Sequence, residues 1–478
     1  MAKPRVLLFP FPALGHVKPF LSLAELLSDA GLDVVFLNSE YNHRRISNVI
    51  ESLSSRFPSL RFETIPDGLP PDQPRSLVDS PLYFTMRDGT KARFRQLIQS
   101  FNDGCSANPW PITCIINDVM LSSPIEVAEE FGIPVISFCP HSARYFYTHF
   151  LVPKLVEEGQ IPYTDENPFG KIEGIPLFEG HLRRNHLPGS WSQQSSHISF
   201  SHSLINQTVA AARSSALILN TFHDLEAPFL THLSSIFNRI YTIGPLHALF
   251  KSKLSNSSSL PPTLVGFQKE DESCISWLDS QPPESVIFVS FGSSMKMEAR
   301  ELTEFWHGLV NSGFRFLCVL RSDGVYGGES AELIEQVVGK KGYDRNVVVV
   351  EWADQEKVLS HPAIGGFLTH CGWNSTLESI VAGVPMIGWP ILGDQPSNAA
   401  WIDKVWKIGI ERNDEKNWDR STVKMMVREL MDSQKGVEIR RSVKKLSKLT
   451  KENVGKGGLS FDNLEYLVQH IKNLKPYI

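Results

Sequence analysis

The sequence predicts an α/β protein with two doubly wound domains and a cleft between them. Several short apolar segments lack any alternation with polar residues, which indicates strands buried on both faces, as in parallel sheets under helices. At 478 residues the chain is too long for one hydrophobic core, and two domains account for its length. A Ser-rich, Pro-containing stretch at residues 251–263 separates two series of such segments and is the expected linker.

The first series opens with a strand–helix–strand unit. A strand is expected at residues 6–9, an apolar helical periodicity continues until Gly31, and the next strand is expected at residues 34–37. Further strands are expected at residues 114–117, 134–138 and 217–219. The second series has expected strands at residues 286–290, 316–320, 347–350, 365–369 and 386–389.

These two series set the expected domain boundaries. The first domain covers residues 1–250 and the second covers residues 264–455. Residues 456–478 form a further expected helix with an apolar face, for which Ser460 is the candidate N-cap.

Composition excludes several classes of function. A net charge of −5 gives no electrostatic footprint for nucleic acid or an anionic membrane. No apolar run approaches the roughly 20 residues of a membrane helix, and the N-terminal segment does not fit a signal peptide. The six cysteines lie far apart without metal-ligand or redox spacing, which indicates reduced thiols and a cytoplasmic protein.

The segment at residues 352–395 combines features suited to a nucleotide sugar. A buried strand at residues 365–369 is followed by a polar turn and a helix that ends at Gly383, with Asn374 as its expected N-cap. A helix N-terminus presents unpaired N–H groups and a positive dipole end, so it suits a phosphate. Gly372 lets the backbone approach a ligand closely.

Side chains along the same segment suit the other parts of such a ligand. Ser375 adds a hydroxyl donor at the start of the helix, beside the expected phosphate site. Trp352 provides an aromatic ring at one end, and Asp394 with Gln395 provides polar groups at the other. The set predicts a site for a base, a diphosphate and a sugar.

The segment also resembles the signature box of the plant UDP-sugar-dependent glycosyltransferases of small molecules. That box begins at a Trp, carries H-C-G-W-N-S in its middle and closes on D-Q, as residues 352–395 do. The resemblance covers nearly the whole chain. It implies a GT-B fold with two Rossmann-like domains and a last helix that returns to the first domain. It also implies an inverting transfer of glucose from UDP-glucose without a metal, and the chain has no Asp-x-Asp motif for Mg²⁺.

The resemblance assigns roles to individual residues of the box. Trp352 would stack on uracil with Gln355 at the uridine end, and Glu378 would bind the ribose hydroxyls. By default, a Trp is a core residue and a helix Glu is a solvated carboxylate. The implied diphosphate contacts are His370, Asn374, Ser375 and, after an earlier strand, Ser293, which could instead cap the next helix. The implied sugar contacts are Trp373, Asp394 and Gln395, and the final Gln favours glucose over galactose.

His16 and Asp118 each follow an expected strand at its carboxyl end, where catalytic groups of open α/β sheets lie. A histidine can take up a hydroxyl proton, and a carboxylate can orient the imidazole and stabilise its protonated form. The alternative is a His that caps its own helix and an Asp that closes a turn. Two such residues at two strand ends, matching two family positions, favour a general base and its partner.

Four residues depart from the family pattern. Leu14 and Lys18 stand where the family often has Gln and Asn, and Asp354 replaces a usual Pro. Pro140 stands where many members keep a Thr that contacts the 6-hydroxyl of the sugar, which leaves His141 or Ser142 as a replacement.

The acceptor site is predicted from aromatic residues in the first domain. Tyr83 with Phe84, residues 144–150 and Trp191 would line an apolar pocket, although core packing accounts for each alone. The first domain resembles the cucurbit glucosyltransferases that act on mogrol, which implies a cucurbitane triterpenoid acceptor. An iridoid, a flavonoid or another small alcohol is the alternative acceptor.

Two other functions are alternatives to the transferase. A nicotinamide oxidoreductase needs G-x-G-x-x-G after the first strand, and this chain has Phe-Pro-Phe-Pro there. A non-catalytic nucleotide-sugar-binding protein would keep the box but would need no proton acceptor, which His16 and Asp118 argue against. The expected partners are UDP-glucose and a lipophilic acceptor, bound by a monomer without a cofactor.

Overall fold

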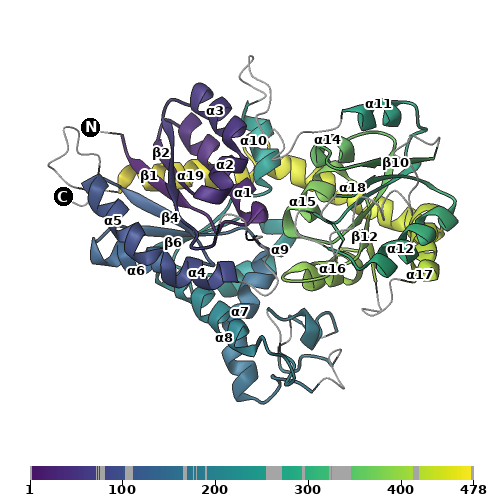
Figure 1. Ribbon diagram of the computed structural model, residues 1–478, viewed down its shortest axis with the longest axis horizontal. Coiled ribbons are helices and arrows are strands. Elements are labelled where there is room, and N and C mark those ends of the chain that lie inside the picture. The colour runs from purple at the N-terminus through teal and green to yellow at the C-terminus, as the bar shows by residue number, and fades with distance from the viewer. Residues whose placement is uncertain are drawn as a thin grey trace. The chain divides into compact units, whose positions relative to one another are not determined.

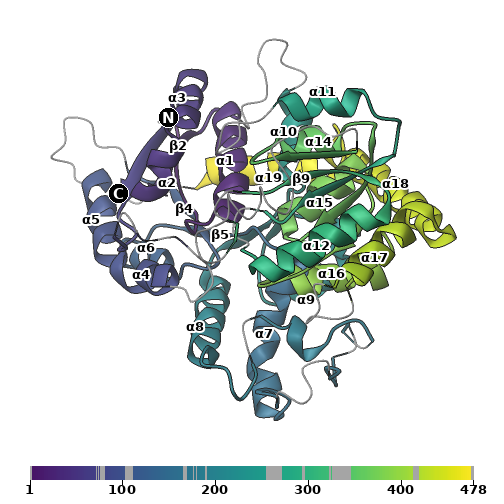
Figure 2. The same cartoon turned by 45° about the vertical axis from the view of Figure 1, so that its right-hand side comes forward.

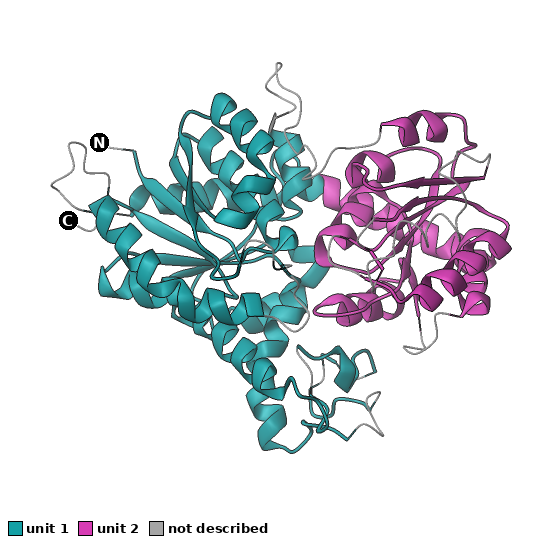
Figure 3. Cartoon of the chain, viewed as in Figure 1, with its two compact units in different colours: residues 1–265, 452–478 teal, residues 266–451 magenta. Residues whose placement is uncertain are grey.

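The computed structural model describes residues 3–70, 73, 75, 81–102, 111–164, 170–175, 177–178, 180–188, 191–254, 272–292, 296–321, 324–325, 346–412 and 419–474. The chain divides into two compact units, residues 1–265 with 452–478 and residues 266–451 (Figure 3). Each unit contains one parallel sheet with helices on both faces, so the predicted α/β class with two Rossmann-like domains is confirmed.

The sheet of the first unit has the order β3-β2-β1-β4-β5-β6-β7, and all its strand pairs are parallel. The strands are β1 (Arg5–Phe9), β2 (Asp33–Ser39), β3 (Leu60–Ile65), β4 (Cys114–Asp118), β5 (Val135–Cys139), β6 (Ala216–Leu219) and β7 (Ile240–Thr242). In β1, β4 and β5 every residue is buried, which explains why they lack an alternating pattern.

Helices α1 to α3 lie on one face of this sheet and α4 to α6 on the other (Figures 1 and 2). The helices are α1 (Leu14–Asp29), α2 (Glu40–Arg45), α3 (Ser47–Arg56), α4 (Pro81–Gly89), α5 (Lys91–Asn102), α6 (Ser123–Glu130), α7 (Ala143–Glu157), α8 (Ile198–Val209), α9 (His223–Leu233) and α10 (Leu246–Leu254). Helix α1 ends just before Gly31, as predicted, and Gly31 follows its C-cap in the left-handed conformation with φ of 82°.

The last helix, α19 (Leu459–Asn473), packs on β7 in the first unit. The prediction that Ser460 caps this helix is wrong, because the N-cap is Gly458 and Ser460 lies inside the helix. The Ser460 hydroxyl instead donates to the Gly244 carbonyl at 2.7 Å, which fixes α19 to the loop after β7. Residues 251–254 of the expected linker are part of α10, and residues 255–263 lie outside the described residues.

The sheet of the second unit has the order β10-β9-β8-β11-β12-β13, again entirely parallel. Its strands are β8 (Val286–Ser290), β9 (Arg315–Val319), β10 (Val347–Val350), β11 (Ile364–Thr369), β12 (Met386–Gly388) and β13 (Gly409–Glu411). Its helices are α11 (Ser273–Asp279), α12 (Ala299–Ser312), α14 (Gln355–Leu359), α15 (Trp373–Ala382), α16 (Gln395–Lys404), α17 (Arg420–Asp432) and α18 (Gln434–Val454). Helices α12 and α17 pack on each other at one face of the sheet, and α14 packs on α15 at the other (Figures 1 and 2).

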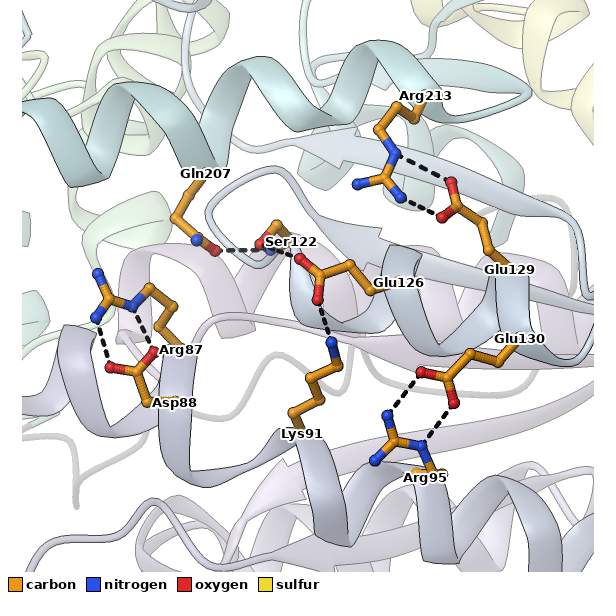
Figure 4. A network of polar contacts seen from close by, with 10 residues as sticks. All are labelled: Arg87, Asp88, Lys91, Arg95, Ser122, Glu126, Glu129, Glu130, Gln207 and Arg213. Atoms are coloured by element: carbon orange, nitrogen blue, oxygen red, sulfur yellow. Dashed lines mark hydrogen bonds and ion pairs between the residues drawn. The ribbon is translucent and has the colours of Figure 1, made fainter.

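Ion pairs join the outer helices of the first unit at its surface (Figure 4). Helix α5 is linked to α6 by Arg95 with Glu130, in a bidentate pair, and by Lys91 with Glu126. Because these side chains are partly or largely exposed, the pairs contribute little to stability. In the part of the chain that the structure describes, no helix has the length and apolar character needed to cross a membrane.

Candidate functional site

His16 and Asp118 contact each other at the carboxyl edge of the first sheet. The Nδ1 atom of His16 lies 2.7 Å from Oδ2 of Asp118, and both residues are buried. The backbone N–H of Phe11 donates to the same oxygen at 3.2 Å, and that of Met120 donates to Oδ1 at 3.0 Å. With Nδ1 held by the carboxylate, Nε2 is the nitrogen left to accept a proton.

The alternative explanations for these two residues apply only in part. The N-cap of α1 is Ala13, and His16 lies within the helix rather than capping it. Asp118 does close a turn through Met120, but the same carboxylate also binds His16. The adjacent strands β1 and β4 bring the pair together, since Phe9 is in register with Asn117.

The turn after β5 brings a second histidine beside His16. The ring centroids of His141 and His16 are 4.9 Å apart, in an edge arrangement at 79°. Pro140 is buried, and the Ser142 hydroxyl accepts the N–H of Tyr145 at 3.1 Å as the N-cap of α7. Ser142 is completely buried and engaged in the cap, and the ring of His141 packs against that of His16, so the replacement of the missing Thr by either residue stays a prediction.

In the second unit, the turn after β11 leads directly into α15. The helix begins at Trp373, and its N-cap is Gly372, with φ of −58° and ψ of 146°. The prediction that Asn374 caps the helix is therefore wrong, because Asn374 is already the second helical residue. The N–H groups of the first turn still face outward along the helix axis, which keeps this end suited to an anion.

His370 fills the space that two glycines leave open. A Cβ atom on Gly372 would lie 2.5 Å from His370 Nε2, and one on Gly292 would lie 2.8 Å from the same ring. Any larger residue at either position would displace the imidazole. Burial lowers the pKa of His370 to about 4, with the backbone of Ser290 opposing the shift. His370 is therefore neutral at pH 7 and would offer a hydrogen bond, rather than a positive charge, to a diphosphate.

Gln355, Ser375 and Glu378 form one hydrogen-bonded group. The Nε2 amide of Gln355 donates to Ser375 Oγ at 2.8 Å and to Glu378 Oε2 at 2.6 Å. Glu378 is buried, so it is not the solvated helix carboxylate of the default explanation. Trp352 is half-buried rather than part of the core. Asp354, which replaces the usual Pro, caps α14 by accepting the N–H of Lys357 at 3.0 Å and thereby positions Gln355.

Asp394 and Gln395 lie at the start of α16, where Asn398 joins Asp394 to the turn after β11. The Asn398 amide donates to Asp394 Oδ2 at 2.8 Å and to the carbonyl of Cys371 at 2.9 Å. The Gln395 Oε1 atom accepts the N–H groups of residues 391–392, so its amide group remains for a ligand. Asn398 could not be predicted from the sequence, because an Asn inside a helix carries no pattern of its own.

The remaining predicted residues have different surroundings. The ring of Trp373 is buried and packs against Trp406 with centroids 6.2 Å apart, so only its backbone could meet a sugar. Asn374 is half-buried, and Ser293 lies outside the described residues. Among the described residues, no group of three His, Cys, Asp or Glu side chains could hold a metal ion.

The aromatic residues proposed for the acceptor site belong mainly to the core. Tyr83, Tyr145 and Trp191 are buried, whereas Phe84 is 38% exposed. Tyr83 packs edge-on against Phe84 at 5.5 Å and against Phe200 at 5.0 Å between ring centroids. In this group of Tyr83, Phe84 and Phe200, the rings that a lipophilic ligand can reach are therefore those of Phe84 and the half-buried Phe200.

Comparison with known proteins gives a consistent result. The model of the family described as UDP-glucoronosyl and UDP-glucosyl transferase matches residues 267–455. Mogroside I-A1 synthase of Siraitia grosvenorii is 74% identical over 96% of this chain and 86% of its own length. The 7-deoxyloganetic acid glucosyltransferase of Catharanthus roseus is 43% identical over 98% of each chain.

Solved structures resemble the chain over nearly its full length. Os79 from O. sativa in complex with UDP has a TM-score of 0.81 at 26% identity, covering 98% of this chain and all of its own. Phytolacca americana UGT2, complexed with UDP-2fluoro-glucose and pterostilbene, has a TM-score of 0.77 at 26% identity, covering 98% of this chain and 99% of its own.

Proposed function

The chain belongs to the plant UDP-glycosyltransferase family, and on this basis we propose that it transfers glucose from UDP-glucose to a hydroxyl of a lipophilic plant metabolite. The observation that carries the proposal is the buried hydrogen bond between His16 and Asp118, in a chain that also has the Gln355–Ser375–Glu378 group. The first provides a proton acceptor, and the second provides polar atoms for a uridine and its ribose.

The proposed reaction is a single displacement. His16 Nε2 removes the proton of the acceptor hydroxyl, and the oxygen attacks the anomeric carbon as the bond to UDP breaks. Asp118 stabilises the imidazolium that forms, since its Oδ2 is already 2.7 Å from Nδ1. Attack from the face opposite the leaving UDP converts the α-linked donor into a β-glucoside.

Donor binding is proposed for the second unit. Trp352 stacks on uracil with Gln355 beside it, and Glu378 binds the ribose hydroxyls. The N-terminus of α15, with Asn374, Ser375 and His370, holds the diphosphate. Asp394 and Gln395 bind the sugar hydroxyls, with the backbone at Trp373 and Gly372 close by. Helix N–H groups rather than a metal offset the phosphate charge, so activity should survive EDTA.

The proposed acceptor is a cucurbitane triterpenoid alcohol such as mogrol. The support is the 74% identity with a relative named mogroside I-A1 synthase. The exposed ring of Phe84 adds an apolar surface for such a skeleton. An iridoid is the alternative, because a relative at 43% identity is named 7-deoxyloganetic acid glucosyltransferase. Mogrol and 7-deoxyloganetic acid offered together with excess UDP-glucose, with products separated by mass, would decide between the two.

The catalytic roles can be tested with one pair of variants and a matched control. We expect His16→Ala to lose about 10²–10⁴-fold in kcat while UDP-glucose still binds, because only the proton acceptor is removed. Asp118→Asn should lose activity to a smaller degree. The control is His223→Ala, which removes an exposed histidine of the same unit. A His16→Ala enzyme with parental turnover would show that His16 has a structural role only.

Donor preference offers a second test. A site built to bind a particular hydroxyl disfavours a sugar that misplaces it, because its buried polar groups are then left unpaired. We therefore expect kcat/KM for UDP-glucose to exceed that for UDP-galactose, and Gln395→Ala to reduce the difference. Equal values in the parent enzyme would contradict the roles of Asp394 and Gln395.

We further propose that the enzyme acts in the cytoplasm as a monomer. The five described cysteines are buried thiols, as expected for a protein from a reducing compartment. Light scattering on the purified protein measures the oligomeric state, and a fluorescent fusion in plant cells reports the compartment.

A further inference from the structure

We propose that His141 is a positioning residue for His16, and that its uncharged ring holds the catalytic imidazole in place during proton transfer. The inference rests on the proposed role of His16 as the base. It concerns a residue outside the signature box, on the turn between β5 and α7.

The His16 ring is contacted by groups from three segments of the first unit. Asp118 binds Nδ1 from the end of β4 at 2.7 Å. Phe11, in the loop before α1, has its ring centroid 5.6 Å from that of His16 at 60°. His141 approaches more closely, at 4.9 Å and 79°. The His16 ring turns about the Cα–Cβ and Cβ–Cγ bonds, and its two ring contacts oppose tilting of the ring that one hydrogen bond still allows.

His141 is itself held firmly. Cys139, the last residue of β5, has its Sγ 3.8 Å from His141 Nδ1 and also contacts the His141 carbonyl at 3.7 Å. The Tyr145 ring packs edge-on at 5.5 Å between centroids. Pro140 on one side has a fixed φ, and Ser142 on the other is anchored as the N-cap of α7. The supporting ring therefore has little freedom to move away from His16.

Burial, with a smaller effect of neighbouring histidines, keeps His141 neutral. The titratable groups that face it are His16 from α1, Cys139 from β5, and Tyr145 with His149 from α7. Burial, together with His16 and His149, lowers the pKa of His141 well below its usual range. Burial also lowers the pKa of His149 to about 4. Of the two histidines, Asp118 therefore pairs with His16 alone, because the neutral His141 ring carries no positive charge that would compete for the carboxylate.

This arrangement directs the proton to one nitrogen. The proton of the acceptor hydroxyl goes to His16 Nε2, the new carbon–oxygen bond forms, and the bond to UDP breaks with its electron pair on the departing phosphate. His141 gains and loses nothing in this step. A charged neighbour at 4.9 Å would oppose formation of the His16 imidazolium, and a neutral ring does not.

Two substitutions of His141 distinguish a role of its ring in holding His16 from a chemical role of its nitrogen atoms. His141→Phe keeps a planar ring and removes both nitrogens, whereas His141→Ala removes the ring. We expect kcat to fall by about 10²-fold in His141→Ala, since a small misplacement of the base has that effect, and to stay within about 3-fold of the parent in His141→Phe. The KM for UDP-glucose should be unchanged in both. The control is His232→Ala, an exposed histidine whose ring stacks on Tyr147 of α7.

The pH profile tests the neutrality of His141 separately from the support that its ring gives to His16. The acid limb of kcat/KM, where the base takes up a proton, should coincide for His141→Phe and the parent because the residue removed is neutral. The proposal would be overturned if the acid limb of His141→Phe were displaced by one pH unit. Parental kcat in His141→Ala, or equal losses of kcat in His141→Phe and His141→Ala, would overturn it as well. If His141→Ala has a lower Tm than the parent, the test rests on the kcat and pH profile of His141→Phe alone. Activity retained in His16→Ala would instead overturn the base assignment.

Discussion

Replacing Glu226 with Gln should destabilise the first unit strongly, because this buried carboxylate holds the start of α7. Glu226 and Arg144 are both completely buried, with their closest charged atoms 3.8 Å apart. The two carboxylate oxygens also accept the backbone N–H groups of Ala143 at 2.9 Å and Arg144 at 3.0 Å. Glu226 itself has non-helical φ and ψ within α9, which aims its side chain at α7.

The expected loss of folding stability follows from the buried groups that lose a partner when Glu226 becomes Gln. Burial raises the pKa of Glu226, and Arg144 with the two N–H groups opposes the shift without cancelling it. Glu226→Gln leaves the Arg144 charge without its counterion and turns an amide N–H toward one of the backbone donors. Breaking a buried pair on one side costs about 3–5 kcal/mol. At about 2–4 °C per kcal/mol for a large domain, Tm should fall by about 6–20 °C.

The assay compares thermal melting of the parent with that of three variants. Glu130→Gln makes the same chemical change in the exposed pair with Arg95 (Figure 4) and should leave Tm unchanged within error. The double variant Glu226→Gln with Arg144→Met removes both charges and should recover most of the loss. Equal shifts for the two Glu→Gln variants, or a double variant no better than Glu226→Gln alone, would refute the reasoning. Activity should also fall in Glu226→Gln, since the turn with His141 precedes α7.

Substitutions at three further positions test a close contact, a helix cap and a buried carboxyl group. Gly372→Ala should raise the KM for UDP-glucose by displacing His370, which its Cβ would meet at 2.5 Å, without changing kcat/KM ratios among acceptors. Asp354→Ala should lower Tm by removing about 1 kcal/mol of capping on α14, and Asp354→Ser should restore it. Glu25, whose pKa burial raises from 4.5 to about 8, keeps its proton in the folded state while the unfolded chain loses it, so parental stability falls as pH rises through that window. Glu25→Gln should therefore melt higher than the parent at pH 8, by a margin that shrinks toward pH 5, and a constant margin would contradict this.

The parallel strands that are buried throughout could be predicted from the sequence, because both of their faces must be apolar. The strands that were not predicted lie at sheet edges or are very short. Strand β3 (Leu60–Ile65) is buried only at its two ends, and β7 and β13 have three residues each. Too few apolar residues remain in such strands to distinguish them from a loop.

The two wrong N-cap predictions share one physical cause. Asn374 and Ser460 are residue types that favour the N-cap, but in both helices a glycine two positions earlier occupies it. The N-cap needs an extended backbone before the first helical turn, and Gly372 and Gly458 both have ψ near 150°. Composition identifies a residue able to accept the N–H bond, whereas the preceding strand or helix determines where the chain turns.

The candidate site residues of the first unit and those of the second also differ in how far apart in the chain their contacts lie. Gln355 reaches Ser375 and Glu378 across 20 and 23 residues, so the donor group sits within one continuous segment that sequence alone can reveal. His16 and Asp118 are 102 residues apart, and Glu226 reaches the start of α7 across 83 residues. Strand order alone brings these groups together. Changes at Glu226 or His141 can therefore alter the position of His16 without touching the signature box.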